Sequence, residues 1–303
     1  MNNVIRKLIK FYYILHPKKI MEGIFGNNIP QYDEIYFWNS DFFTESIRSY
    51  YAMQGKNLKC FIFEEGYISY FPFEDIAING NDIKLIKFRN KLAKIPHLVR
   101  EKIDGLIVFE PSLLLAKPAC PVYTIDRKIG DNKEFREIID KIFNAKEVSK
   151  KYDKKYIIFE ENRPEIDDEK LFDKIIDIVG KDNVIIKLHP VRKEDRFSKK
   201  DVKTLGSDGV PWEAIAFAGN FSDKVLIAIG SGSVTSYRIL FGNNMKAFLM
   251  FKFLNSNIKQ FDNKYQEFWD NLEAKDDKGG IYMPRTEEAF YQILEKEKES
   301  DDK

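Results

Sequence analysis

The chain alternates short apolar runs with longer charged segments, and this alternation limits its possible folds more than any other feature. Several runs are apolar throughout rather than at every second position, as expected of strands covered on both faces of a sheet. The charged segments 134–148 and 168–179 have the spacing of helices. Alternating elements of this kind predict an α/β fold with parallel sheets and right-handed crossovers. The predicted strands are 34–38, 58–66, 105–110, 120–126, 155–162, 183–190, 224–233 and 246–251.

The length of 303 residues favours two domains over one hydrophobic core. A polar, lysine-rich stretch at 144–155 separates two strand–helix series. We therefore predict a Rossmann-like domain over 1–150 and a second over 151–303, which ends in a helix at 285–300. We expect both to be doubly wound and to face each other across a cleft. Ligands of such folds bind beyond the carboxyl ends of the strands, so the residues that follow strands are the candidates for a binding site.

The overall composition excludes several classes of protein. With 49 basic and 48 acidic residues, the chain has no global attraction for nucleic acid, so an anion site must be local. Cys60 and Cys120 are too few and too far apart for a disulfide framework or a zinc site, and they suit a reducing cytoplasm. No convincing metal-ligand cluster and no apolar run of about 18 residues is present, so we expect neither a metal ion nor a transmembrane helix.

The first 20 residues combine apolar positions at helical spacing with several lysines and arginines. Two interpretations are equally open: peripheral contact with an anionic membrane surface, and an amphipathic helix packed on its own domain. We interpret His16 and His97, two of the three histidines, as structural.

Two adjacent carboxylates and a glycine follow the apolar residues 58–63. A carboxylate near apolar or acidic groups can have its pKa raised enough to accept a proton from a sugar hydroxyl. Glu64 and Glu65 are therefore candidate bases, with Gly66 as the turn, although a solvated turn has the same composition.

A lysine and the third histidine end the run 183–190. On a strand, Lys187 and His189 point to the same side. Lysine supplies charge to a phosphate and histidine donates a hydrogen bond or a proton, while Pro190 ends the strand. This pattern predicts a phosphate site, and an ordinary strand end stopped by proline is the alternative.

Two further candidates follow along the chain. Glu213 opens a small-residue helix within 209–219, where it either contacts a nucleoside or only interacts with the helix dipole. The run 224–233 leads into Gly-Ser-Gly-Ser and another helix, an arrangement whose amides and hydroxyls suit an oxyanion. The residues predicted to hold this anion are Gly230, Ser231, Gly232, Ser233 and Thr235.

Together these motifs resemble those of the bacterial sialyltransferases of glycosyltransferase family 52, which are related to families 80 and 38. Those enzymes carry an acidic motif that ends in glycine, then a His-Pro motif, and then a serine-rich motif. The corresponding residues are Glu64-Glu65-Gly66, His189-Pro190, and Ser231-Gly232-Ser233 with Thr235. The resemblance is best over residues 58–250.

The resemblance implies a GT-B fold and an inverting reaction that needs neither a metal ion nor a cofactor. Sialic acid would move from CMP-sialic acid to a terminal galactose of a lipooligosaccharide or capsule precursor. Glu65, or Glu64, would be the base; His189 would act on the departing CMP, Ser231 and Ser233 would hold it, and Glu213 would contact the nucleoside. It also implies a cytoplasmic enzyme, peripheral on the inner face of the membrane if residues 1–20 tether it, and is compatible with a homodimer.

Other carboxylates and other functions remain open at this point. Family members can use an acid roughly twenty residues before the His-Pro motif, which makes Glu160, Glu161 and Asp167 rival bases, and we favour Glu65. The rival functions are a CDP-glycerol-type phosphotransferase, another CMP-sugar glycosyltransferase, and a non-catalytic nucleotide- or polysaccharide-binding protein.

Overall fold

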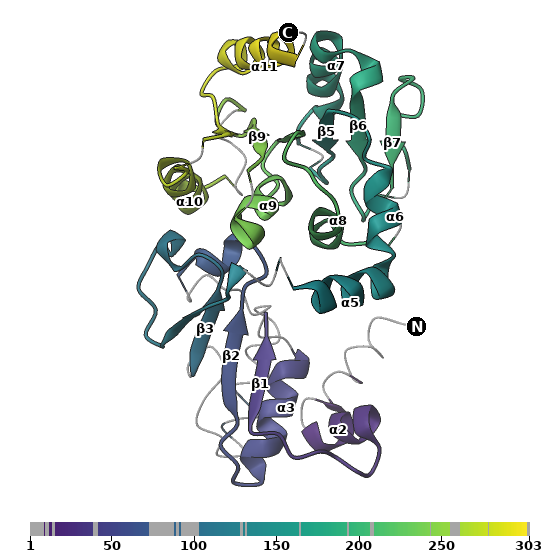
Figure 1. The fold of residues 1–303 in the computed structure, drawn as a ribbon. Helices are drawn as coiled ribbons and strands as arrows, with labels where there is room; N and C mark the ends of the chain where they lie inside the picture. The colour runs from purple at the N-terminus through teal and green to yellow at the C-terminus, as the bar shows by residue number, and fades with distance from the viewer. Residues whose placement is uncertain are drawn as a thin grey trace. The chain divides into compact units, whose positions relative to one another are not determined.

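The chain divides into two compact units, Met1–Ile125 and Asp126–Lys303. Each unit has its own parallel β-sheet (Figure 1). The computed structural model describes residues 9, 12–13, 16–38, 42–72, 88, 91, 103–127, 130, 132–163, 165–192, 194–206, 209–242, 244–254, 261–277 and 279–301.

The sheet of the first unit has four parallel strands in the order β1-β2-β3-β4. Helix α2 packs against α3, and Met21 and Tyr51 at their contact are fully buried. The elements are α2 (Pro17–Phe25), β1 (Glu34–Phe37), α3 (Phe42–Met53), β2 (Lys59–Phe63), the 3-10 helix η1 (Tyr67–Tyr70), β3 (Gly105–Val108), the 3-10 helix η4 (Pro111–Leu113) and β4 (Val122–Thr124).

The sheet of the second unit has six parallel strands in the order β10-β9-β8-β5-β6-β7. The strands are β5 (Tyr156–Phe159), β6 (Val184–Lys187), β7 (Lys203–Leu205), β8 (Val225–Ala228), β9 (Lys246–Leu249) and β10 (Ile281–Tyr282). Every residue of β5, β6 and β8 is buried. These strands are short and, apart from Lys187 at the end of β6, apolar, because helices cover both faces of the sheet.

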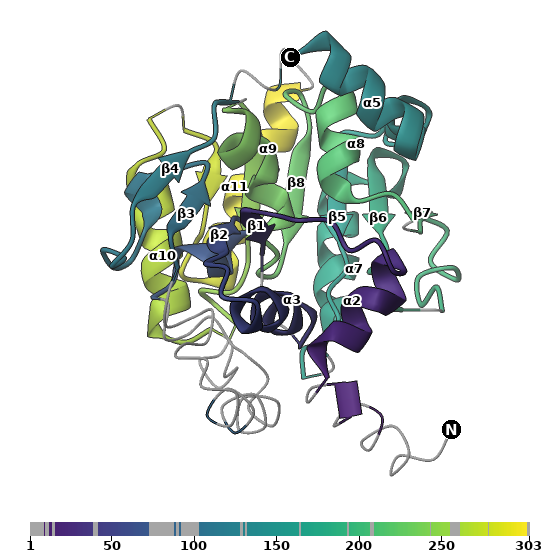
Figure 2. The ribbon, with the colours of Figure 1, turned by 90° about the horizontal axis from the view of Figure 1, so that it is seen from below.

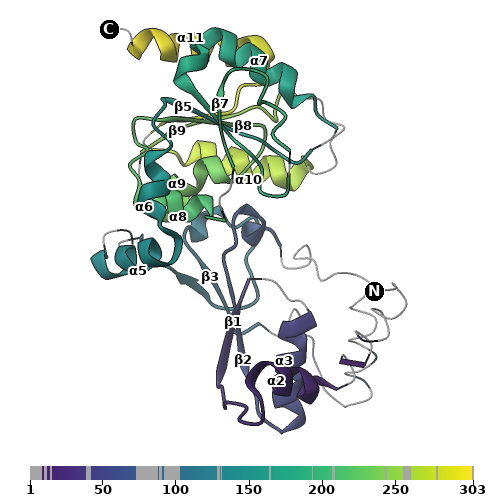
Figure 3. The ribbon, with the colours of Figure 1, turned by 90° about the vertical axis from the view of Figure 1, so that its right-hand side faces the viewer.

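Helices α7 and α11 pack together on one face of this sheet, and α8 and α9 pack together on the other (Figure 3). The helices of the unit are α5 (Lys133–Phe143), α6 (Ala145–Lys150), α7 (Asp168–Val179), α8 (Trp212–Ala218), α9 (Ser233–Phe241), α10 (Asn263–Ala274) and α11 (Glu287–Asp301), with the 3-10 helix η6 (Lys181–Asn183).

The strand order of the second unit reverses at β5, which lies between β6 and β8 (Figure 2). The chain adds β6 and β7 on one side of β5, and β8, β9 and β10 on the other. Connections that leave in opposite directions open a crevice beyond the carboxyl ends of β5 and β8, where doubly wound folds bind their ligands. In the described part of the first unit the strands follow chain order, so the crevice belongs to the second unit.

All eight predicted strands are present, and the predicted helix 168–179 coincides with α7. The predicted helix 134–148 is instead two helices, because Asn144 takes a left-handed conformation with φ of 52° between α5 and α6. The predicted final helix at 285–300 is α11, from Glu287 to Asp301. The short strands β7 and β10 were missed.

The division between the units follows Ile125, earlier than the predicted division at 150. Both α5 and α6 pack on α8 of the second unit, which groups the segment before 150 with that unit. The facing of two domains across a cleft, as in GT-B enzymes, stays a prediction.

No helix in the described part of the chain is long and apolar enough to cross a membrane. Most of residues 1–20, and His97, lie outside the described residues. His16 precedes α2, and its Nδ1 lies 2.8 Å from the carbonyl oxygen of Tyr12.

Candidate functional site

The carboxyl ends of β5, β6 and β8 place most of the predicted residues of the second unit at one edge of its sheet. Glu160 and Glu161 follow β5, His189 and Pro190 follow β6, and the glycine–serine loop follows β8. Hydrogen bonds to the carboxylates of Glu160 and Glu161 join these three strand ends directly.

The carboxylate of Glu160 is completely buried and links β5 to the end of β6. Its Oε2 accepts a 2.8 Å hydrogen bond from the backbone N–H of His189. Its Oε1 accepts bonds from Nε and Nη2 of Arg196 at 2.9 and 2.6 Å. Both of its oxygens therefore accept hydrogen bonds from the protein itself, and this carboxylate is poorly placed to be a base.

Glu161 makes the corresponding link from β5 to the end of β8. Its carboxylate, 6% exposed, accepts a hydrogen bond from the backbone N–H of Gly230 and another from Nε of Arg163. Asp167, the third rival base, caps α7 by accepting the N–H of Lys170 at 3.3 Å. Each of the three rival carboxylates thus has a structural task.

His189 is half-buried at the edge of the sheet. The N–H of Val191 donates to its Nδ1 at 3.3 Å, so in the neutral ring the proton lies on Nε2. Burial lowers the pKa of His189 below its ordinary value, the charge of Glu160 opposes this, and the charge of Lys187 adds to the lowering. Pro190 is exposed and follows directly. Nε2 is therefore the atom from which this side chain can donate to a ligand.

Lys187 is a buried cation, with 7% of its surface exposed, and within the described residues no hydrogen bond or ion pair engages its ammonium group. Its ammonium lies 5.8 Å from the centre of the Phe159 ring. Burial lowers the pKa of Lys187, and the nearby carboxylate of Glu213 opposes that effect. A charge held this way is costly unless a ligand compensates it, which suits an anion site.

Glu213 is exposed in the first turn of α8, as the sequence predicted. Its Oε1 accepts a 3.3 Å hydrogen bond from the hydroxyl of Ser236 in α9. Glu213 therefore connects the two helices that cover this face of the sheet, close to Lys187.

The glycine–serine loop joins β8 to α9. Ser231 and Ser233 are half-buried, and the hydroxyl of Ser231 accepts the N–H of Ser233 at 3.3 Å. Gly232 is the N-cap of α9, and as a glycine it has no side chain that could cap the helix. Thr235 is fully buried, and its hydroxyl donates to the carbonyl of Gly232 at 3.0 Å, so it stabilises the first turn of α9.

Gly230 allows two aromatic side chains to approach the loop closely. A Cβ at this position would lie 2.5 Å from the hydroxyl of Tyr265 and 2.7 Å from the ring of Phe261. The Tyr265 hydroxyl donates to the carbonyl of Gly230 at 2.6 Å, while Glu161 accepts the Gly230 N–H. Only glycine fits between these groups, which fixes the start of the loop.

The acidic motif of the first unit splits into two different carboxylates. Glu64 accepts the hydroxyl of Tyr70 at 2.5 Å and the N–H of Phe109 at 2.8 Å, so it joins the ends of β2 and β3. Burial raises the pKa of Tyr70, and the nearby charge of Glu64 raises it further. Glu64 therefore belongs to the framework of the first unit.

Glu65 is exposed, and within the described residues no group donates to its carboxylate. Its own N–H lies 2.9 Å from the hydroxyl oxygen of Ser69, which fixes the backbone. Burial of part of the side chain raises its pKa. Gly66 follows with φ of 116° and ψ of −164°, a conformation essentially restricted to glycine. Among the described residues, the motif thus has one carboxylate that no group engages, next to a turn that requires glycine.

Sequence reasoning missed the arginines that hold the rival carboxylates, namely Arg163, Arg192 and Arg196. Arg192 and Arg196 follow the His-Pro motif within a few residues, and both approach Glu160. The sequence did contain a signal for this contact: two arginines follow the end of one predicted strand, and two glutamates follow the end of another.

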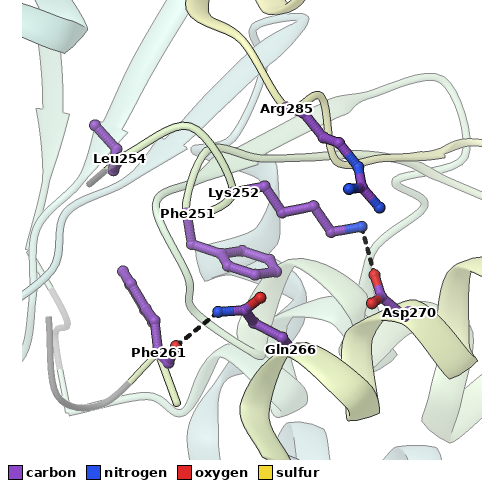
Figure 4. Close-up of a pocket in the computed structure, with 7 residues that line it drawn as sticks. All are labelled: Phe251, Lys252, Leu254, Phe261, Gln266, Asp270 and Arg285. Carbon is purple, nitrogen blue, oxygen red and sulfur yellow. Dashed lines mark hydrogen bonds and ion pairs between the residues drawn. The ribbon is translucent and has the colours of Figure 1, made fainter. Parts of the chain in front are cut away.

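A pocket of about 220 Å³ lies beyond the end of β9 (Figure 4). Its polar groups engage one another: Lys252 pairs with Asp270 at 2.7 Å, and Gln266 donates to the carbonyl of Phe261 at 3.0 Å. The pocket contains none of the predicted site residues. It is lined by Phe251, Lys252, Leu254, Phe261, Gln266, Asp270 and Arg285. Within the described residues, no group of three or more His, Cys, Asp or Glu side chains could hold a metal ion.

A buried lysine whose ammonium group has no partner among the described residues, a histidine and a serine loop thus lie at the carboxyl edge of a parallel sheet, near its switch point, where doubly wound folds bind their ligands. The chain belongs to the alpha-2,8-polysialyltransferase family (POLYST), whose model matches residues 6–246. Family membership supports a sialyltransferase, and hence a glycosyltransferase. A comparison with curated proteins found no match. The more specific assignment to glycosyltransferase family 52 stays a prediction.

Proposed function

We propose that this chain transfers sialic acid from CMP-sialic acid to a hydroxyl of a glycan, with inversion and without a metal ion. The observation that carries the proposal is the convergence of Lys187, His189 and the loop 230–233 on the switch point of the second unit, in a member of the polysialyltransferase family.

In the donor half of the reaction, the bond between C2 of sialic acid and a phosphate oxygen of CMP breaks. Negative charge develops on that oxygen, and three kinds of group stabilise it. The ammonium of Lys187 supplies positive charge, Nε2 of His189 donates a hydrogen bond or a proton, and the hydroxyls of Ser231 and Ser233 donate at the amino end of α9. CMP has a single phosphate, so no pyrophosphate requires a bridging Mg²⁺.

In the acceptor half, Glu65 takes the proton of the attacking hydroxyl. Its carboxylate is the one in the two acidic pairs that no described residue engages, and its raised pKa makes it a better proton acceptor than an ordinary glutamate. The hydrogen bonds of Glu64, Glu160 and Glu161 support this choice over its rivals.

The description of the family bears on the acceptor. An α-2,8 linkage joins the donor to the C8 hydroxyl of another sialic acid, which favours an acceptor that ends in sialic acid. The sequence motifs alone predicted a terminal galactose. We therefore propose a sialic acid-terminated glycan as the acceptor, with a galactose-terminated glycan as the second candidate.

The test is to incubate the full chain with labelled CMP-sialic acid and one of two acceptors, lactose or a short oligosialic acid, in buffer with and without EDTA. We expect CMP release and lengthening of the oligosialic acid, unaffected by EDTA. Transfer to lactose alone would identify galactose as the acceptor. Release of CMP from CDP-glycerol, with none from CMP-sialic acid, would overturn the proposal in favour of a phosphotransferase.

The variant His189→Ala provides the control for catalysis. We expect its turnover to fall by about 10² to 10⁴-fold while its thermal unfolding stays close to that of the wild type. If neither protein turns over any CMP-linked donor but both bind CMP, the chain is a nucleotide-binding protein rather than an enzyme.

A further inference from the structure

The backbone of His189 is held by a carboxylate that lies on the neighbouring strand. Glu160 follows β5 directly, and its backbone N–H donates to the carbonyl of Lys187 at 2.9 Å. Its side chain then accepts the N–H of His189 at 2.8 Å. The first bond extends the backbone pairing of β5 and β6 past its last pair, and the second holds the backbone of His189 through a side chain. The position of His189 therefore depends on Glu160.

A buried carboxylate needs compensating positive charge. Arg196 makes the shorter contact with Glu160, at 2.6 Å, and Nε of Arg192 lies 3.4 Å from the same oxygen. The guanidinium of Arg196 donates to Glu160 through Nε and Nη2, and to both oxygens of Asp168 at 2.9 and 2.8 Å. Hydrogen bonding to Asp168, and then to Glu160, raises the pKa of Arg196. Asp168 is buried at the start of α7. Arg196 therefore ties the acceptor of the His189 N–H to a helix.

The segment that carries Arg196 is itself anchored at two further points. The hydroxyl of Thr204 in β7 donates to Asp195 at 2.6 Å, and Lys200 lies 2.6 Å from both oxygens of Asp173 in α7. Lys200 docks the same segment on the same helix as Arg196, but has no contact with Glu160 among the described residues. It is a matched control for any effect of Arg196.

The charges around His189 also depend on this arrangement. The carboxylates of Glu160 and Glu161 act to raise the pKa of the imidazole, whereas burial and the charges of Lys187 and Arg192 act to lower it. Loss of the Glu160 charge would leave burial and the two cations opposed by Glu161 alone among these groups. Glu160 therefore has a second effect on His189 besides holding its backbone.

We propose that Glu160 and Arg196 are positioning residues for His189: Arg196 fixes the carboxylate, and the carboxylate fixes the backbone of the histidine. This rests on the proposed function, in which His189 acts on the departing CMP. Neither residue touches the substrate in this scheme, and both act through the histidine.

The test compares Glu160→Gln, Arg196→Gln and the control Lys200→Gln in the full chain. For CMP-sialic acid we expect kcat to fall by about 100-fold in the first two, with KM changing much less, since small misplacements of a reacting group have effects of this size. The control is expected to stay within about twofold of the wild type. If Arg196→Gln does not fold, Arg196→Lys replaces it with the same expectation, because lysine lacks the planar fork.

A second readout needs no substrate. NMR titration of histidine-labelled protein, with the His189 signal assigned from His189→Ala, gives the imidazole pKa directly. We expect a lower pKa in Glu160→Gln and an unchanged one in Lys200→Gln. The proposal would be overturned if both Glu160→Gln and Arg196→Gln had the wild-type kcat and the wild-type pKa of His189. It would also be overturned if kcat fell as much in Lys200→Gln as in these two variants.

The two readouts separate this proposal from the proposed function. Suppose that Glu160→Gln shifts the pKa of His189 but that His189→Ala turns over CMP-sialic acid normally. His189 would then have no role in catalysis, and Glu160 could not position it for catalysis. If His189→Ala is inactive but Glu160→Gln and Arg196→Gln behave as the wild type, the proposed function stands and the positioning role fails.

Discussion

Both units end a buried strand with two consecutive glutamates, and the two pairs are used differently. In the first unit, Glu64 bonds to the framework and Glu65 has no described donor to its carboxylate. In the second unit, Glu160 and Glu161 are both engaged, one towards β6 and the other towards β8. The same Glu-Glu sequence therefore contains three carboxylates with structural hydrogen bonds and one, Glu65, that no group in the described part of the chain engages.

The largest expected effect comes from the free carboxylate. Glu65→Gln should lower sialic acid transfer by about 10² to 10⁴-fold, because the acceptor hydroxyl loses its base. Its thermal unfolding should match that of the wild type, since no described group donates to this carboxylate. Steady-state turnover and calorimetry check the two halves of this prediction. A large loss of stability with little loss of turnover would reverse the assignment.

Glu161 should show the opposite balance. Glu161→Ala leaves the buried guanidinium of Arg163 without its carboxylate, and the side chain of Arg163 is 12% exposed. Breaking a buried pair in this way costs about 3–5 kcal/mol in the free energy of unfolding. Urea unfolding measures this loss of stability, and we expect the conservative variant Glu161→Gln to be more stable than Glu161→Ala. A stable but inactive Glu161→Gln would instead support Glu161 as the base.

Glu64 should show a smaller loss of stability. Glu64→Ala removes the acceptor of the Tyr70 hydroxyl and of the Phe109 N–H, which costs about 1–3 kcal/mol in the free energy of unfolding. Denaturant unfolding of this variant beside Glu65→Ala gives a direct comparison within one motif. Equal midpoints for the two variants would contradict the division of roles.

The smallest expected effect concerns pH. Burial raises the pKa of Glu65, so the carboxylate is deprotonated only above a pKa higher than the ordinary glutamate value of about 4.3. Since a base must be deprotonated, kcat/KM should fall as the pH falls through that raised value. A pH profile of kcat/KM measures the position of this acidic limb. An acidic limb at or below the ordinary value would indicate a different base.

Much of the fold could be predicted from the sequence because most strand positions fall in short, largely apolar runs. The apolar runs gave all eight predicted strands, and Gly180 marked the end of α7. The two missed strands, β7 and β10, have three and two residues and lack such a run. The candidate site followed from the same logic, because parallel strands bring their carboxyl ends to one edge.

The use of each carboxylate could not be predicted, because its partners are distant in the sequence. Glu160 meets Arg196 across 36 positions, and Glu64 meets Phe109 across 45. No local pattern distinguishes Glu64 from Glu65, since both follow the same strand. The turn at Gly66 and the position of η1, which supplies Tyr70 to Glu64, determine which of the two carboxylates is engaged. Both depend on packing within the unit.

The most direct test of the central claim, that Glu65 acts on the acceptor while the second unit holds the donor, is CMP release from CMP-sialic acid with and without the acceptor. For Glu65→Gln the account predicts that acceptor-dependent release is lost, while slow release to water and the affinity for CMP remain at wild-type values. Loss of CMP affinity, or acceptor-dependent release at the wild-type rate, would contradict it.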